Sequence, residues 1–167
     1  MSEQAMSHEE VLALYISGPD TLEAALNGLS ESDFDSPYAL GTWTIRQIVH
    51  HLADGDAVWS VGIRMALGAP GVTFRLDWYP GNEAWADTLD YARRAVEPAV
   101  AFFRAHRLYI AQLLKHFPNA WDRYVTMADP EDQQGQPMSV STMVGLLTGH
   151  VTEHVEEIRK IREKQGI

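Results

Sequence analysis

Seven histidines stand in this chain of 167 residues, and two of them have the spacing of metal ligands on one helix. His150 and His154 are four residues apart, so their imidazole rings lie one helical turn from each other on the same face. That face also carries an apolar stripe of Val140, Met143, Leu147, Val151, Ile158 and Ile161. Two imidazoles on a core-facing stripe can chelate one divalent cation. The alternative is a pair of core histidines, each satisfied by a hydrogen bond.

A third histidine points inward from an earlier predicted helix. On a helical wheel His51 lies roughly 40° from the middle of the apolar face, whereas His50 lies roughly 140° away and is expected to face solvent or a partner. Three histidines leave open coordination positions, as catalytic zinc sites do. The sequence therefore predicts one divalent metal ion, Zn²⁺, Ni²⁺ or another first-row cation, on His51, His150 and His154.

Three more residues are candidates for proton transfer near this metal. Asp54 lies one turn after His51 and could hold a ring N–H or orient a water, although it could also be an ordinary boundary carboxylate. His106 is predicted to share the core face of the third helix with Phe102, Phe103, Tyr109, Ile110 and Leu113, and it is either a catalytic group or a core histidine. Glu153 completes an H-x-x-E-H match, the signature of inverted zinc peptidases, in which it would be the general base. Those peptidases are much larger proteins, so a solvated carboxylate is the competing interpretation.

Four stretches of helical periodicity must position these residues. Their predicted bounds are Ser7 to Leu29 with a kink or break at Gly18-Pro19, Thr44 to Leu67, Tyr91 or Ala95 to His116, and Ser139 or Ser141 to Lys164. Capping boxes open the first two, with Ser7 paired to Glu10 and Thr44 to Gln47. The region from Ala120 to Pro137 is polar and irregular, with one short extended piece around Trp121–Val125. The pattern predicts an all-α four-helix bundle that forms a single domain over residues 1–167.

A long aromatic connection separates the second and third helices. It runs from Ala69 to about Asp90 and contains Phe74, Trp78, Tyr79 and Trp85. Soluble proteins rarely expose such a set, so these rings are expected to pack on the bundle, on a second subunit or on a ligand. Trp78 and Trp85 are the predicted substrate contacts, in a segment that would cover the mouth of the metal site.

The composition excludes several classes of function. Asp and Glu number 23 against 13 Lys and Arg, giving a net charge of −10, which disfavours binding to nucleic acids and to anionic membranes. The absence of cysteine excludes disulfides, thiolate nucleophiles and iron–sulfur clusters. The polar start, Met1 to Glu10, lacks the pattern of a signal peptide, and no apolar run is long enough for a transmembrane helix, so a cytoplasmic location is expected.

Two motifs resemble the DinB superfamily and, within it, the YfiT-like group. They are the run Gly41–Asp54, with its Trp-Thr capping box and His-Leu-Ala-Asp ending, and the late H-x-x-x-H pair; the likeness extends over residues 10 to 160. The resemblance implies a four-helix bundle with a long crossover between helices 2 and 3, and nickel or zinc on His51, His150 and His154. It also implies a homodimer. One departure is Gly55, where the YfiT-like run has serine.

The same resemblance implies a metal-dependent hydrolase, or an enzyme that uses bacillithiol, mycothiol or glutathione as a thiol S-transferase or isomerase. The substrate would be a small molecule. Because the chain has no cysteine, any reacting thiol must come from outside the protein. The alternatives are a metal-binding or sensor module without turnover, which is expected if side chains of residues 74 to 85 fill the space beside the metal, and a purely structural bundle.

Overall fold

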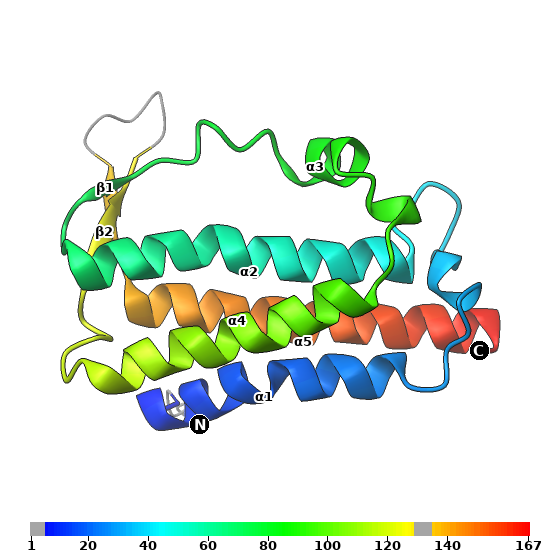
Figure 1. The fold of residues 1–167 in the computed structure, drawn as a ribbon, viewed down its shortest axis with the longest axis horizontal. Coiled ribbons are helices and arrows are strands. Elements are labelled where there is room, and N and C mark those ends of the chain that lie inside the picture. Colours follow the sequence, from blue (N-terminus) through cyan, green and yellow to red (C-terminus); the bar gives the residue numbers. More distant parts are fainter. Residues whose placement is uncertain (1–5, 129–134) are drawn as a thin grey trace, which may run out of the picture.

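Four long helices form the framework of the protein (Figure 1). The computed structural model describes residues 6–128 and 135–167. The four helices are α1 (His8–Leu26), α2 (Ile45–Gly68), α4 (Glu97–His116) and α5 (Val140–Gln165). Both α1 and α2 pack against α4 and α5. The predicted four-helix bundle is therefore confirmed.

The directions of the helices explain the crossover. Helices α1 and α5 run one way along the bundle, and α2 and α4 run the other way (Figure 1). Since α2 and α4 are parallel, the chain must return along the bundle between them, as predicted. This return is more structured than the expected linker, because it includes β1 (Thr73–Phe74), α3 (Asn82–Thr88) and a 3₁₀ turn, η2 (Tyr91–Arg93). The third long helix accordingly begins at Glu97, later than either predicted start.

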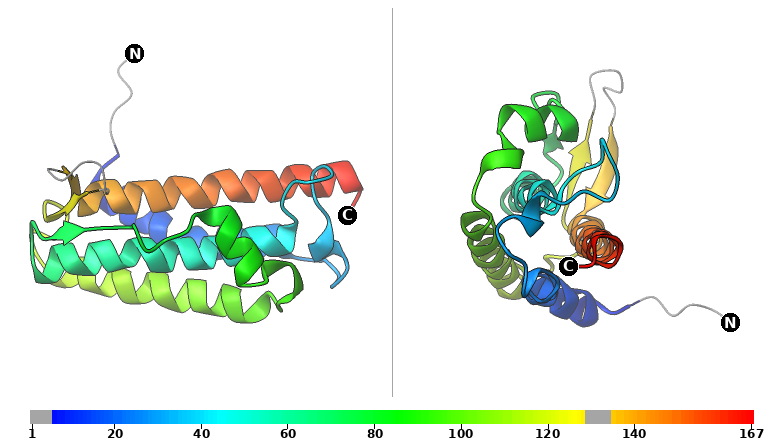
Figure 2. Two further views of the ribbon diagram at one scale, coloured as in Figure 1. Left: turned by 90° about the horizontal axis from the view of Figure 1, so that it is seen from above. Right: turned by 90° about the vertical axis from the view of Figure 1, so that its right-hand side faces the viewer.

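A small three-stranded sheet closes one end of the bundle. Strand β2 (Tyr124–Met127) pairs in parallel with β1 and antiparallel with β3 (Gln136–Ser139). The sheet lies at the end of the bundle where α2 finishes and α5 begins (Figure 2). Of the extended piece predicted around Trp121–Val125, only Tyr124 and Val125 lie in β2, whereas Trp121 and Asp122 form a turn. Residues 129–134 of the predicted irregular region lie outside the described residues.

Local capping sets the starts of three long helices. The Ser7 hydroxyl accepts a hydrogen bond from the Glu10 backbone N–H at 3.3 Å, and the Glu10 carboxylate accepts one from the Ser7 N–H at 2.8 Å. Thr44 and Gln47 repeat this exchange at the start of α2. Ser139 caps α5 by accepting from the Thr142 N–H. Both predicted capping boxes are confirmed, since they depend only on residues three apart.

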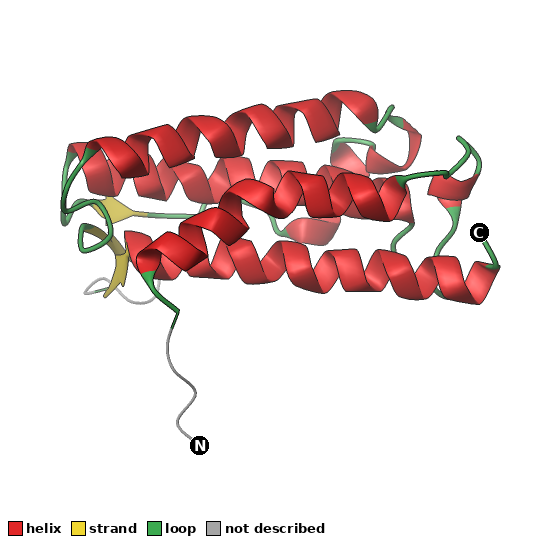
Figure 3. Cartoon of the chain, turned by 90° about the horizontal axis from the view of Figure 1, so that it is seen from below, coloured by secondary structure: helices red, strands yellow, loops and turns green. Residues whose placement is uncertain are grey.

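The Gly18-Pro19 pair bends α1 without ending it (Figure 3). Proline has no N–H, so the carbonyl of Tyr15 loses its usual helical donor. Arg107 on α4 replaces that donor, with Nη1 at 3.0 Å from the Tyr15 oxygen. A Cβ atom at position 18 would collide with the same guanidinium. The pair therefore creates the space in which a buried arginine fits.

Burial along the helices follows most of the predicted stripes, and the exceptions are Leu14 on α1, which was expected on the apolar face but is 46% exposed, and two residues on α4. The predicted core residues of α5 are all buried. On α4, however, Phe102 and Tyr109 were expected on the core face and are instead 45% and 51% exposed. Arg107, which lies between them in the sequence, is fully buried. The inward face of α4 is therefore the face that carries Arg107, and the rings of Phe102 and Tyr109 lie outside that face. Among the described residues, no helix has the length and apolar character that spanning a membrane requires.

Candidate metal centre

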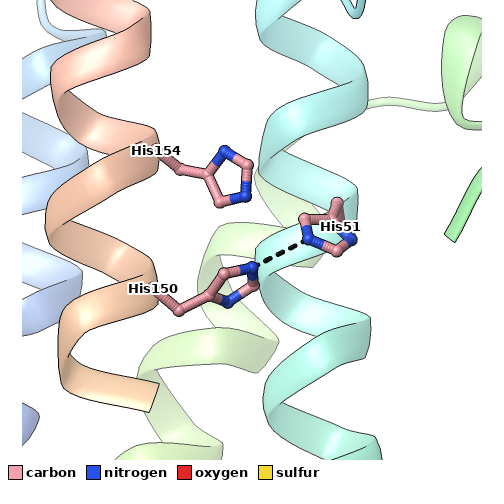
Figure 4. A group of neighbouring side chains, drawn as sticks. All are labelled: His51, His150 and His154. Atoms are coloured by element: carbon pink, nitrogen blue, oxygen red, sulfur yellow. Dashed lines mark hydrogen bonds between the residues drawn. The ribbon is translucent and has the colours of Figure 1, made fainter. Parts of the chain in front are cut away.

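Helices α2 and α5 bring three imidazole rings together in the middle of the bundle (Figure 4). One ring nitrogen from each of His51, His150 and His154 lies within 4.8 Å of the others. The Nε2 atoms of His51 and His150 are 2.8 Å apart, within hydrogen-bonding distance. The ring planes are steeply inclined, with interplanar angles of 84°, 79° and 78°. Three nitrogens thus converge from different directions, which suits one first-row metal ion.

Burial and mutual repulsion keep the rings of His51 and His150 neutral. Burial, followed by the nearby imidazoles of His150 and His154, lowers the pKa of His51 to about 3. The same two causes, burial and then His154, lower the pKa of His150 to about 4. A neutral imidazole has a lone pair available on one nitrogen, and metal binding requires that form. His51 and His150 are therefore in their metal-binding protonation state near neutral pH.

Two neighbours orient the histidines. The Nδ1 atom of His154 lies 2.9 Å from a carboxylate oxygen of Glu157, one turn further along α5. A carboxylate accepts this hydrogen bond, so Nδ1 carries the proton and Nε2 keeps its lone pair. The indole of Trp43 packs edge-on to the His51 ring at 4.8 Å between centroids. The donor set and its supports therefore fit a divalent metal held by neutral imidazoles.

A cavity of about 640 Å³ opens directly beside these rings. His51 and His150 form part of its wall, together with Glu153. The remaining lining comes from α2, from the crossover and from α5, namely Gly55, Val58, Trp59, Leu76, Tyr79, Asn82, Ser141, Thr142, Gly145, Leu146, Leu147 and Gly149. The side chains of residues 74 to 85 thus line the space without filling it.

His50 lies in a different environment from the one predicted. It was expected to face solvent or a partner, but it is only 2% exposed. Its ring stacks on Tyr91 of the crossover, and its Nε2 lies 3.3 Å from the carbonyl oxygen of Arg94. The helical wheel placed this side of α2 correctly relative to the bundle core. The prediction was wrong because the crossover covers that side as well.

Asp54 faces the crossover and contacts the same tyrosine. One of its carboxylate oxygens accepts a hydrogen bond of 2.5 Å from the hydroxyl of Tyr91. Burial is the largest cause that raises the pKa of Tyr91, and this carboxylate adds to it. The described contacts of Asp54 thus connect α2 to η2, and its predicted role toward a histidine or a water stays untested.

Of the other candidate residues, one lines the cavity and three do not. Glu153 lines it, beside the proposed ligands. His106 is absent from its wall; the His106 ring packs against Phe102, and its buried Nε2 has no hydrogen-bond partner within the described parts of the chain. Trp78 and Trp85 are also absent from the wall and pack against Tyr79, which does line it. Their predicted substrate contacts remain a prediction.

Sequence reasoning did not single out two groups at this site. Glu157 follows His154 by three residues, and that helical spacing was a usable signal. The glycines Gly145 and Gly149 form part of the cavity wall, but an isolated glycine in a helix carries no signal of a cavity until the opposite wall is known. Tyr79 was noted only as a member of the aromatic set.

The geometry can now be compared with known proteins. The family model of the DinB superfamily matches residues 14–158. The chain belongs to the DinB superfamily. A relative from Geobacillus thermodenitrificans, named "Putative metal-dependent hydrolase", is 30% identical over 148 residues, which cover 89% of this chain and 80% of the relative. YfiT of Bacillus subtilis, whose name also includes "Putative metal-dependent hydrolase", is 24% identical over 157 residues, with the same coverage.

Two solved structures share the fold of this chain. The structure of Bacillus subtilis YfiT, described as a probable metal-dependent hydrolase with an unusual four-helix bundle topology, aligns with a TM-score of 0.83 at 21% identity, covering 99% of this chain and 93% of that one. A mycothiol-dependent maleylpyruvate isomerase aligns with a TM-score of 0.68 at 17% identity, covering 92% of this chain and 61% of that one. At these identities the likeness concerns the fold alone.

Proposed function

We propose that this DinB-superfamily protein is an enzyme that holds one divalent metal ion on His51, His150 and His154. The observation that carries the proposal is the open cavity beside three converging imidazoles. When bound there, a divalent metal lowers the pKa of a water or thiol ligand so that it can react near neutral pH. A non-catalytic metal-binding or sensor module would need no space for a substrate beside the metal.

Each residue of the site has a distinct task in this proposal. The three histidines hold the ion, and Glu157 keeps His154 in the required tautomer. Glu153, at the cavity wall, is the candidate acceptor for a proton released near the metal. Asp54 acts as a positioning residue that attaches the crossover to α2 through Tyr91. The crossover then limits the access of water to one side of the cavity.

The reacting nucleophile is water or a low-molecular-weight thiol. The names of the relatives support hydrolysis, and the fold shared with a mycothiol-dependent isomerase supports a thiol. Nickel or zinc, a homodimer and a cytoplasmic location complete the proposal as expectations from the family resemblance. No nucleic acid or membrane partner is proposed.

Metal content is the first test of this proposal. Wild-type protein is expected to retain about one zinc or nickel ion per chain in elemental analysis, and His51→Ala or His150→Ala less than about a tenth of that. His116→Ala is the matched control, because His116 is exposed and remote from the cluster in sequence. Wild-type metal content in either ligand variant would contradict the site.

Turnover is the second test. The metal-loaded protein is assayed with p-nitrophenyl acetate for hydrolysis, and with 1-chloro-2,4-dinitrobenzene plus glutathione, bacillithiol or mycothiol for thiol transfer. Activity in one assay that disappears in His150→Ala identifies the nucleophile. Stoichiometric metal binding without activity in any of these assays would favour the sensor module.

A further inference from the structure

The cavity beside the histidines is nearly free of charge. Glu153 is its one formally charged wall residue among the parts of the chain that the structure describes. The remaining wall is apolar or neutral, and includes Val58, Trp59, Leu76, Leu146 and Leu147. Neither lysine nor arginine is among these lining residues, and the whole chain carries a charge of −10. An anionic substrate group placed against this wall, away from the proposed metal, would lose hydration without gaining a cationic side chain as a partner.

Glycines create the width of the cavity. Gly145 and Gly149 lie one turn apart on α5, and an added Cβ atom at either position would meet nothing within 4 Å. Glycine in a helix interior costs about 0.8–1.0 kcal/mol relative to alanine. No neighbouring atom therefore requires glycine at these two exposed positions, and the missing side chains leave their space to the cavity that both residues line.

Gly62 shows the contrast. This glycine also lies inside a helix, but a Cβ atom there would meet the Phe74 ring at 2.9 Å. Close packing of the crossover on α2 thus explains Gly62. Gly55 lies between these cases, because its Cβ would make an ordinary contact of 3.4 Å with the His150 ring.

We propose that the cavity accepts an uncharged, mainly apolar substrate group, and that Gly145 and Gly149 set the width available to it. The reacting end of the substrate lies at the three histidines, and its apolar body lies between Trp59 of α2 and the glycine face of α5. This inference rests on the proposed metal centre and names the substrate class of that site.

Binding of hydroxamates to the zinc-loaded protein tests the proposal without any turnover. Acetohydroxamate, benzohydroxamate and 4-carboxybenzohydroxamate share one metal-binding head and differ only in the tail. Calorimetry is expected to show benzohydroxamate binding at least about tenfold more tightly than acetohydroxamate, because the ring is buried against apolar walls. The carboxylate of 4-carboxybenzohydroxamate is expected to remove most of this gain in affinity, because it would be buried without a cationic side chain nearby.

Gly145→Leu tests the assignment of the wall. This substitution should lower the affinity for benzohydroxamate at least about fivefold, because the new side chain occupies the space of the phenyl ring. The affinity for acetohydroxamate and the zinc content should stay unchanged, and the melting temperature should not fall. Gly68→Leu is the matched control, because Gly68 also has open space around it and does not line this cavity. If the Gly145→Leu protein loses zinc, the variants Gly145→Ala and Gly149→Ala are measured instead. Each should lower the affinity for benzohydroxamate, by a smaller factor than expected for leucine.

The outcomes separate the two proposals. Absence of zinc and of acetohydroxamate binding would refute the metal centre itself. Zinc and acetohydroxamate binding with no gain from the phenyl ring, or with no loss from the carboxylate, would refute the apolar substrate class. An unchanged preference in both the leucine and alanine variants would refute the role of the glycines.

Discussion

Two polar clusters lie inside the same bundle, and they differ in how fully their hydrogen bonds are satisfied. Around Arg107, two bonds go to the Asp56 carboxylate at 3.0 and 2.8 Å, and two go to the carbonyls of Tyr15 and Leu147. The Tyr15 hydroxyl completes the cluster by donating to Asp56. The guanidinium also lies against the rings of Tyr15 and Phe103, at 4.3 and 4.5 Å. The polar groups of this cluster therefore have their hydrogen-bond partners within the protein.

The histidine cluster is open by comparison. Its one internal hydrogen bond joins His51 to His150, and these two rings line a cavity of about 640 Å³. Burial without full pairing is unfavourable unless a ligand supplies the missing interaction. The difference indicates that the Arg107 cluster specifies the packing of all four long helices, whereas the histidine cluster is arranged to bind something from outside. The predictions below test this contrast.

Breaking the closed cluster should have the largest effect on stability. Asp56→Ala leaves the Arg107 guanidinium buried without its counter-ion, which is expected to cost about 3–5 kcal/mol of unfolding free energy in urea denaturation. The double variant Asp56→Leu with Arg107→Met removes both charges and should recover much of the loss. Asp20→Ala breaks an exposed pair with Arg104 and should change little. A loss in Asp56→Ala no larger than this control would show that the closed cluster is not structural.

The open cluster should make the metal-free protein sensitive to acid. Burial lowers the folded-state pKa of His51 and His150 to about 3 and about 4. The unfolded histidines take up protons near pH 6.5 and the folded ones do not, so stability is present above pH 6.5 and is lost as the pH falls toward 4. By pH 5 the loss is expected to be roughly 1–2 kcal/mol for each of the two histidines.

Urea denaturation of chelator-treated protein at pH 7 and pH 5 measures this loss. His50 and His106, whose pKa values burial also lowers, contribute in the same direction. The double variant His51→Asn with His150→Asn should therefore reduce the pH dependence without abolishing it. A wild-type protein equally stable at both pH values would mean that the histidines are not held neutral by the fold.

Removing the one carboxylate support of the open cluster should have the smallest effect. Glu157→Gln keeps a hydrogen-bond acceptor for His154 but removes the charge, and about a tenfold loss of zinc affinity is expected in chelator competition. Glu156→Gln is the matched control, because Glu156 is exposed and contacts Arg159. Equal zinc affinities in the two variants would remove Glu157 from the site.

Local sequence signals predicted much of the framework. The capping boxes at Ser7 and Thr44 need only a partner three residues away, so both could be identified without a fold. The apolar stripes showed which face of α2 and of α5 is turned toward the core. His51, His150 and His154 lie on those faces, and their rings meet at one point. The bend at Pro19 was also foreseeable, because a missing N–H acts within a single helix.

Contacts between distant segments decided the rest. His50 is buried by Tyr91, more than forty residues away, and a helical wheel contains no information about a crossover that covers its polar side. The charged pair of Asp56 and Arg107 was not predicted as core, because each charge is tolerated inside only when the other is present. Gly145 and Gly149 became wall residues only once α2 and the crossover supplied the opposite side. The sequence by itself determined the helices and the direction of their histidines through interactions a few residues apart, whereas burial, charge pairing and the cavity depend on neighbours that only the tertiary structure provides.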